Sequence, residues 1–379
     1  MRQFFDITIT GVRIMILPAY EQLDTVHLQR LFDNMSECYK LFWFQAIVNQ
    51  VHSGKTQLSY DELINIMISD AWYMVTEYRL NLGPADNLED LVHYAQKLFG
   101  LKSSEKKAAI VSALENCQDR DLIRRKQILT YNVPYRLQAP FMPSFKGKDW
   151  EGPKSAVSDR INGFSGLLYR FDSISGLQST ITVDDQWAEY ISRNYEILAG
   201  WIQFNMIQYL QRRNPSVPGI PNKLEPPQER NLTKVIQYWR VILSLNPMQD
   251  IYGGIALDPS AISIDHFIPW SYVAHDELWN LHPTTKSINS SKSNNLPDWN
   301  KYFERLCKSE FIAYKTMWQN DQAHSAFDRC AKEHINSTDV MHKLYRTGHN
   351  EGSFAAALEE IIKPVYSAAE SLGFLRWSL

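Results

Sequence analysis

The sequence predicts a mainly α-helical protein, α+β overall, with one short strand–strand–helix unit embedded in its second half. Three observations support this fold class. Apolar residues recur at three-and-four spacing, the period of a helix face, through residues 23–44, 63–78 and 187–210. Strand signals are confined to residues 5–17 and 262–284. Helices should therefore make up most of the chain.

Residues 1–245 are expected to form a mainly helical body. A small hairpin is predicted over residues 5–17, where β-branched residues alternate with polar ones before Pro18. Residues 120–176 combine many basic residues with glycines and prolines, which predicts a basic, irregular segment.

Two helix starts in this body have the spacing of capping boxes. Ser59 stands three residues before Glu62, and Thr182 stands three residues before Asp185. In such a pair the hydroxyl and the carboxylate satisfy backbone donors at the helix start. Helices are expected directly after both hydroxyl residues.

The second half of the chain begins after a proline-rich segment, residues 214–227, and one further helix over 231–245. Residues 246–300 are expected to form a small domain that carries the chemistry. The C-terminal segment, residues 301–379, is predicted to be helical and to pack on that domain. Pro364 should kink or divide its last helix.

Length and composition are those of a folded, soluble protein. The chain has 379 residues, of which 44% are hydrophobic and 21% charged. Its apolar runs are far shorter than the roughly 20 residues that span a bilayer, so no membrane association is expected. The first ten residues lack the pattern of a secretory signal, which favours a cytoplasmic location.

The cysteines predict neither a zinc site nor a disulfide framework. They lie far apart along the chain, without the close pairs that a structural zinc site requires. We expect reduced residues within the core. The four are Cys38, Cys117, Cys307 and Cys330.

Charge is distributed unevenly along a chain whose net charge is −3. Residues 120–170 hold ten basic residues against four acidic ones, whereas residues 247–300 hold two basic against six acidic. A protein that binds nucleic acid is expected to carry a basic face. Such a face is therefore predicted in the first of these segments and not in the second.

Residues with catalytic chemistry are concentrated between residues 262 and 297. Asp265 and His266 adjoin each other, and two carboxamides, Asn280 and Asn289, follow within 25 residues. This set suits phosphodiester hydrolysis. A magnesium-type ion takes hard oxygen ligands and keeps several waters, so one carboxylate and one amide oxygen are enough. An imidazole of near-neutral pKa can deprotonate the attacking water.

The same segment resembles the HNH nuclease family, whose ββα-metal motif also occurs in colicin-type nucleases, restriction enzymes and CRISPR RNA-guided nucleases. The resemblance covers about 55 residues, and its intervals are similar to those of the RNA-guided nucleases. Many family members carry paired cysteines for a structural zinc, which are missing here, so flanking helices must brace the motif. The matching positions are Asp265, His266, Pro269, Asn280, Asn289, Lys292 and Pro297.

The resemblance implies a divalent-metal-dependent endonuclease with a β-hairpin followed by a helix. Asp265 and Asn289 would hold one Mg²⁺ or Mn²⁺ ion, and His266 would act as the general base. Asn280 would orient the loop that presents His266. Adjacent residues on a regular strand face opposite sides, so a bulge or a strand end is expected at the Asp265–His266 pair.

Contacts to nucleic acid are predicted less specifically. Lys292 would either contact phosphate or lie on a solvated helix face. The cluster Arg124, Arg125 and Lys126 is either a solvated helix face or a site that contacts the DNA backbone. His275 and His282 are left outside the catalytic set.

The leading functional hypothesis is an endonuclease that acts on double-stranded DNA, in bacterial restriction or anti-phage defence by association with similar chains. RNA or single strands are alternative substrates. A hypothesis from another class makes the helical body an interaction or sensor module, through which a partner defence subunit gates the nuclease. A catalytically dead scaffold is a third.

Overall fold

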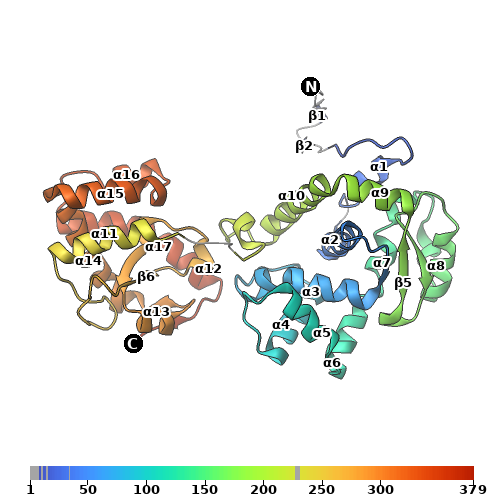
Figure 1. Ribbon diagram of the computed structural model, residues 1–379, viewed down its shortest axis with the longest axis horizontal. Coiled ribbons are helices and arrows are strands. Elements are labelled where there is room, and N and C mark those ends of the chain that lie inside the picture. Colours follow the sequence, from blue (N-terminus) through green and yellow to red (C-terminus); the bar gives the residue numbers. More distant parts are fainter. Residues whose placement is uncertain (1–7, 10–11, 14–15, 34, 227–230) are drawn as a thin grey trace. The chain divides into compact units, whose positions relative to one another are not determined.

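The computed structural model describes residues 8–9, 12–13, 16–33, 35–226 and 231–379, and most of these residues lie in helices (Figure 1). The mainly helical fold class is therefore confirmed. The chain forms two compact units. Unit 1 contains the described residues up to Pro215 together with Lys223–Pro226, and unit 2 contains Ser216–Asn222 and the described residues from 231 onward. Nowhere in these ranges is a helix long and apolar enough to cross a membrane.

Unit 1 is built around two adjacent helices, α2 (Tyr39–His52) and α3 (Tyr60–Thr76). α2 also packs against α9 and α10, and α3 against α4 and α5 (Figure 1). The other helices of unit 1 are α1 (Thr25–Gln29), α4 (Asn87–Phe99), α5 (Lys107–Glu115), α6 (Arg120–Ile128), α7 (Val133–Arg136), α8 (Lys154–Asn162), α9 (Asp185–Arg193) and α10 (Tyr195–Arg213).

Two details of unit 1 differ from the sequence pattern. Residues 23–44 do not form one helix, since α1 ends at Gln29 and α2 begins at Tyr39. Asp33 and Ser36, which lie between them, have low helix propensity. The basic segment, residues 120–176, is more regular than expected, because it forms α6, α7, α8, a strand and short 3₁₀ turns.

A small antiparallel sheet also belongs to unit 1, with strand order β3 (Gln57–Ser59), β5 (Thr180–Val183), β4 (Tyr169–Ser173). Ser59 caps α3 by accepting a hydrogen bond from the Glu62 N–H at 3.2 Å, as predicted. The second half of the predicted capping box is not formed, because the Glu62 carboxylate pairs with Lys55. The prediction for Thr182 was wrong: this residue lies within β5, and Asp184 caps the following helix.

The predicted N-terminal hairpin lies partly outside the described residues. Two short strands, β1 (Thr8–Ile9) and β2 (Val12–Arg13), pair in antiparallel fashion. Residues 5–7, 10–11 and 14–15 are not described, so the full extent of the hairpin stays a prediction.

Unit 2 places a two-stranded sheet among helices. The sheet consists of β6 (Ser263–His266) and β7 (Leu281–Thr284), which pair in antiparallel fashion. A parallel pair, β8 (Leu296–Pro297) and β9 (Arg376–Trp377), joins the end of the chain to the segment after the sheet. The helices of unit 2 are α11 (Thr233–Leu245), α12 (Trp270–Val273), α13 (Lys286–Lys292), α14 (Trp299–Gln319), α15 (Asp321–His334), α16 (Thr338–Leu344) and α17 (Glu351–Ser371).

The last long helix contains a proline. Pro364 lies inside α17, which runs without interruption from Glu351 to Ser371, so the proline does not divide the helix. Buried residues on both sides of it, including Leu358 and Tyr366, hold α17 against the core of unit 2. Packing of this apolar face offsets the backbone hydrogen bond that proline cannot make.

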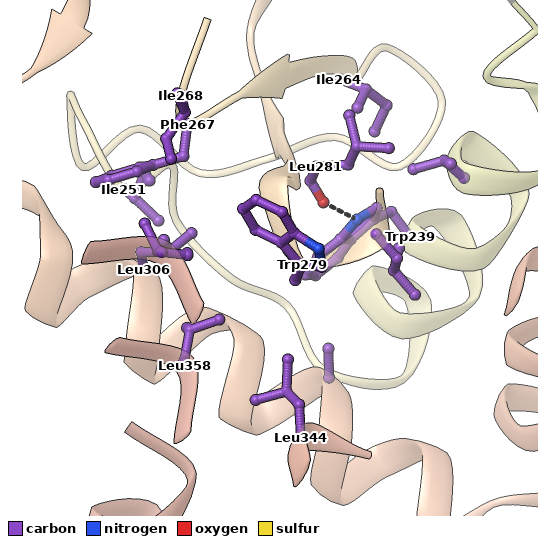
Figure 2. Close-up of a cluster of buried hydrophobic side chains, with 14 of the residues drawn as sticks. Trp239, Ile251, Ile264, Phe267, Ile268, Trp279, Leu281, Leu306, Leu344 and Leu358 are labelled. Atoms are coloured by element: carbon purple, nitrogen blue, oxygen red, sulfur yellow. Dashed lines mark hydrogen bonds between the residues drawn. The ribbon is translucent and has the colours of Figure 1, made fainter. Parts of the chain in front are cut away.

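One hydrophobic core joins the short sheet to the flanking helices (Figure 2). It takes Ile264 and Leu281 from the strands, Trp239 from α11, Leu306 from α14 and Leu358 from α17. The indole N–H of Trp239 donates a hydrogen bond to the Leu281 carbonyl at 3.0 Å. A sheet of eight residues has little core of its own, so these helices supply the apolar surface that it needs.

We predict that Trp239→Phe destabilises unit 2 by about 1–3 kcal/mol, because the Leu281 carbonyl loses its indole donor within the core. Chemical denaturation monitored by circular dichroism measures the change. Trp318→Phe is a matched control, since Trp318 is 42% exposed and its replacement should cost no more than about 0.5 kcal/mol. Equal effects of the two changes would contradict the role given to Trp239.

Candidate active site

The residues singled out in the second half of the sequence lie on β6, β7, α13 and the loop between the strands. β6 and β7 pair in a regular register in which Asp265 faces His282 and His266 faces Leu281. The intervening residues form α12 and a 3₁₀ turn, Leu278–Asn280, and α13 follows β7 after a single residue, Thr285. Thr285 caps α13 by accepting a hydrogen bond from the Ile288 N–H.

Asn280 ties the two ends of the loop together. Its side-chain carbonyl accepts a hydrogen bond from the Ile268 N–H at 2.7 Å, and its amide group donates to the Ile268 carbonyl at 2.9 Å. Its own backbone carbonyl accepts from the Phe267 N–H at 2.9 Å. All three residues are fully buried, so Asn280 fixes the backbone directly after His266.

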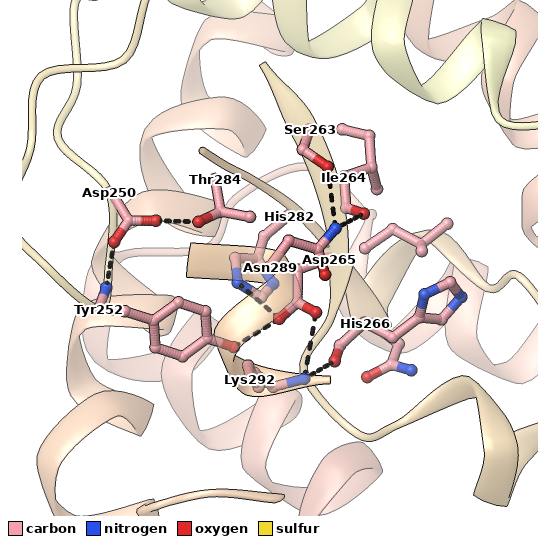
Figure 3. A network of polar contacts seen from close by, with 12 residues as sticks. Asp250, Tyr252, Ser263, Ile264, Asp265, His266, His282, Thr284, Asn289 and Lys292 are labelled. Atoms are coloured by element: carbon pink, nitrogen blue, oxygen red, sulfur yellow. Dashed lines mark hydrogen bonds and ion pairs between the residues drawn. The ribbon is translucent and has the colours of Figure 1, made fainter. Parts of the chain in front are cut away.

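Asp265 lies at the centre of a buried polar network (Figure 3). Its Oδ1 receives the Lys292 ammonium at 3.1 Å, and its Oδ2 receives the Tyr252 hydroxyl at 2.7 Å. Lys292 also donates to the His266 carbonyl at 2.7 Å. Asp265 is 4% exposed and Lys292 is 0% exposed, so this ion pair is shielded from solvent.

The protonation of this network follows from its burial. Burial lowers the pKa of His282 to about 4, although Asp265 acts in the opposite direction. His282 is therefore neutral near pH 7, with its Nε2 atom 3.6 Å from Asp265 Oδ2. Burial lowers the pKa of Lys292, and Asp265 partly reverses this effect. Burial raises the pKa of Tyr252 well above its usual value, so its hydroxyl remains a donor. Lys292, whose Nζ lies 3.1 Å from Asp265 Oδ1, is the cationic side chain placed to compensate Asp265.

His266 projects away from Asp265, as expected for neighbours on a strand (Figure 3). The strand ends at His266, while its register with β7 shows no bulge. The Nε2 atom of His266 lies 2.7 Å from Asp276 Oδ1, in the loop between the strands. The backbone carbonyl of Asp276 is in turn 2.8 Å from Nδ1 of His334 on α15. Helix α15 therefore helps to hold the loop that contacts His266.

Asn289 fastens α13 to β6. Its amide group donates to Ser263 Oγ at 2.9 Å and to the Ile264 carbonyl at 3.0 Å (Figure 3). One turn further along the same helix, Lys292 reaches Asp265. Two side chains of α13 therefore fix this helix against the strand that carries Asp265 and His266.

The residues expected to hold a metal ion do not fit one in this arrangement. Both oxygens of Asp265 are engaged, and the charge beside Oδ1 is the ammonium of Lys292. A divalent ion at the same oxygen would be repelled by that ammonium. Among the described residues, no group of three or more His, Cys, Asp or Glu side chains is placed to hold a metal.

The basic cluster of unit 1 offers less charge to solvent than the sequence suggests. Lys126 is buried and forms an ion pair with Asp61. The Arg125 guanidinium lies over the Tyr94 ring, 4.8 Å from its centre. Arg124 is exposed and pairs with Asp121 at 3.2 Å. Contact between this cluster and a DNA backbone remains a prediction. It depends on Arg124, because Lys126 would have to break its ion pair with Asp61 to reach DNA.

Residues 250–298 match the family model described as HNH endonuclease. We call this segment the HNH domain because of its similarity to that family. The match covers β6, β7, α13 and the loop that contains Asp276, so it confirms the resemblance seen in the sequence. Comparison with curated proteins and with solved structures found no match for the chain.

Several features of the HNH domain were not predicted from the sequence. Lys292 is neither on a solvated face nor turned toward solvent for phosphate, because it is buried against Asp265. Tyr252 lies thirteen residues before its partner Asp265, in a segment with no recognisable pattern. Asp276 could have been considered as a partner of His266, since it is an acidic residue in the predicted loop.

We predict that Asn280→Ala removes protection at the backbone of Ile268. The change leaves a buried N–H and a buried carbonyl without partners, at a cost of about 1–3 kcal/mol for each group. Hydrogen–deuterium exchange of the peptide that contains Ile268 measures the effect. Asn295→Ala, which removes one partly buried bond to the Lys292 carbonyl, is the control. Unchanged exchange at Ile268 in Asn280→Ala would show that the Asn280 side chain does not hold the backbone of Ile268.

Proposed function

We propose that the protein is a divalent-metal-dependent HNH endonuclease that hydrolyses phosphodiester bonds in DNA, with double-stranded DNA as its main substrate. The observation that carries this proposal is the pairing of His266 with Asp276 at the end of β6, inside the segment that matches the HNH family. Restriction or anti-phage defence in the bacterial cytoplasm is the biological setting that we propose.

His266 is the proposed general base. A carboxylate beside Nε2 favours the tautomer with the proton on that nitrogen, which makes Nδ1 the basic atom. The Asp276 charge also stabilises the imidazolium that forms when a water molecule gives up its proton. Asn280 supports this role, because it fixes the backbone at Ile268, two residues after the base.

Mg²⁺ or Mn²⁺ is the proposed cofactor, since HNH nucleases generally use a divalent metal. Asp265 and Asn289 remain the proposed ligands, as a carboxylate and an amide oxygen are the hard donors that these ions take. Binding at Asp265 Oδ1 would require Lys292 to move away from that oxygen, because the two cations compete for it. The proposed active form therefore differs from the arrangement described above.

The acidic character of the HNH segment supports a second candidate function, a nuclease subunit gated by a partner protein. Residues 247–300 carry six acidic residues against two basic ones, so this segment repels a nucleic-acid backbone. A partner that delivers the substrate would overcome this repulsion. In that case the purified protein would not cleave DNA by itself.

We predict that the purified protein nicks supercoiled plasmid in the presence of Mg²⁺ or Mn²⁺, and that His266→Ala lowers the rate by about 10²-fold or more. Gel analysis of the plasmid forms over time measures the rate. His324→Ala is the matched control, because His324 is an exposed histidine of the same unit that lies 3.8 Å from Asp328.

Three outcomes of this assay would redirect the proposal. Equal nicking by wild type and His266→Ala would exclude His266 as the base. Undiminished nicking in EDTA would exclude the metal requirement. Cleavage of single-stranded DNA or RNA in place of plasmid would keep the chemistry and change the substrate.

We predict that Asp276→Asn lowers kcat by about tenfold or more with little change in KM, because the amide neither holds the Nε2 proton as firmly nor stabilises the imidazolium. Asp276→Glu should recover part of the loss. Asp328→Asn, which alters the exposed pair with His324, is the control. A change confined to KM, or equal loss in both amide variants, would show that Asp276 does not position His266.

A further inference from the structure

Unit 1 contains a pocket of about 660 Å³ that no part of the proposed nuclease reaction uses. It lies between the start of α2 and α7, two helices that pack against each other. Lys40 and Arg136 line it, together with the polar side chains of Tyr39, Asn87 and Asn132. Its volume is within the range of pockets that bind small molecules.

Cations gather around this pocket. The Arg136 guanidinium lies over the Trp150 ring, 4.1 Å from its centre, and the Lys154 ammonium lies over the Tyr135 ring at 5.2 Å. Burial is the main cause that lowers the pKa of Lys40 and of Lys154, and the nearby charge of Arg136 lowers both further. Arg136 is therefore close enough to repel both ammonium groups.

Two carboxylates lie near these three cations, because Asp33 partly raises the pKa of Lys40 and Glu37 lines the pocket. In the part of the chain that the structure describes, neither Arg136 nor Lys154 forms an ion pair with a carboxylate. Glu37 is the acidic residue that lines the pocket, against the two cations Lys40 and Arg136. A surplus of positive charge that is partly withdrawn from water favours an anionic ligand.

We propose that this pocket binds a phosphoryl group, carried by a nucleotide or by a nucleic-acid backbone. A guanidinium held over an indole ring is pre-organised for two parallel hydrogen bonds to phosphate oxygens. The Lys40 ammonium on the pocket wall adds charge, as does Lys154, which lies beside Arg136 and does not line the pocket. The amides of Asn87 and Asn132 can bind the rest of the ligand. The binding does not depend on the proposed nuclease chemistry.

Each source of the phosphoryl group has its own consequence. A nucleotide would make the pocket a regulatory site in the helical body. If the source is a nucleic-acid backbone, the pocket would supply the substrate-binding surface that the acidic HNH segment lacks. The pocket would then take the DNA-binding role that was predicted for Lys126, which is buried. The two sources share one chemistry and are separated by the choice of probe.

Equilibrium binding of the full-length protein tests the proposal. The probes are fluorescently labelled ATP and a labelled short DNA duplex, both in EDTA so that no cleavage occurs. Arg136→Gln and Lys154→Gln are each compared with wild type. Arg193→Gln is the matched control, because Arg193 of α9 belongs to the same unit and pairs with Glu189 at 2.5 Å.

We expect the wild type to bind at least one probe and both variants to weaken that binding by about tenfold, as for the loss of a hydrogen bond to a charged group. The control should bind as the wild type does. Loss confined to ATP identifies a nucleotide as the source, and loss for the duplex identifies the backbone. Binding of neither probe by the wild type would overturn the proposal. Unchanged binding by both variants, or an equal loss in Arg193→Gln, would also overturn it.

Discussion

The buried ion pair between Asp265 and Lys292 is the interaction on which the arrangement of the HNH domain depends. It joins the strand that carries His266 to the helix that carries Asn289, and the same ammonium holds the His266 carbonyl. Because His282 is neutral, it does not compensate the negative charge of Asp265. The Lys292 ammonium compensates that charge. Removing one partner of a buried pair costs more than the pair itself contributes, because the remaining charge is left without compensation. The position of α13 on β6 is therefore tightly specified.

The same carboxylate explains why the site has two proposed states. Asp265 is the proposed metal ligand, yet in the described arrangement a lysine takes the place of the metal. His266 lies on the other side of the strand with its own carboxylate, Asp276. The contact between His266 and Asp276 does not involve Asp265, whereas the backbone carbonyl of His266 is held by the same lysine that pairs with Asp265.

Much of this fold could be predicted from local signals in the sequence. The first strand of the HNH domain follows from its apolar residues and from Pro269, which ends it. The loop and the helix after it were expected with the help of the resemblance to the HNH family, which rests on the interval between Asn280 and Asn289. The burial of Lys292 could not be predicted, because it depends on a partner 27 residues away and on helices that enclose both. The helix start predicted at Thr182 was wrong for a related reason. The spacing of Thr182 and Asp185 fits a helix start, but Thr182 belongs to β5, which pairs with β3 and β4.

A double-mutant cycle on Asp265 and Lys292 tests the central claim most directly. The free energy of unfolding is measured in urea for the wild type, Asp265→Asn, Lys292→Met and the double variant. Each single change is predicted to cost about 3–5 kcal/mol, because it leaves a buried group without its partner. The double variant should lose about 2–3 kcal/mol less than the sum of the two. Additive losses would show that the two residues are not coupled and would contradict the account.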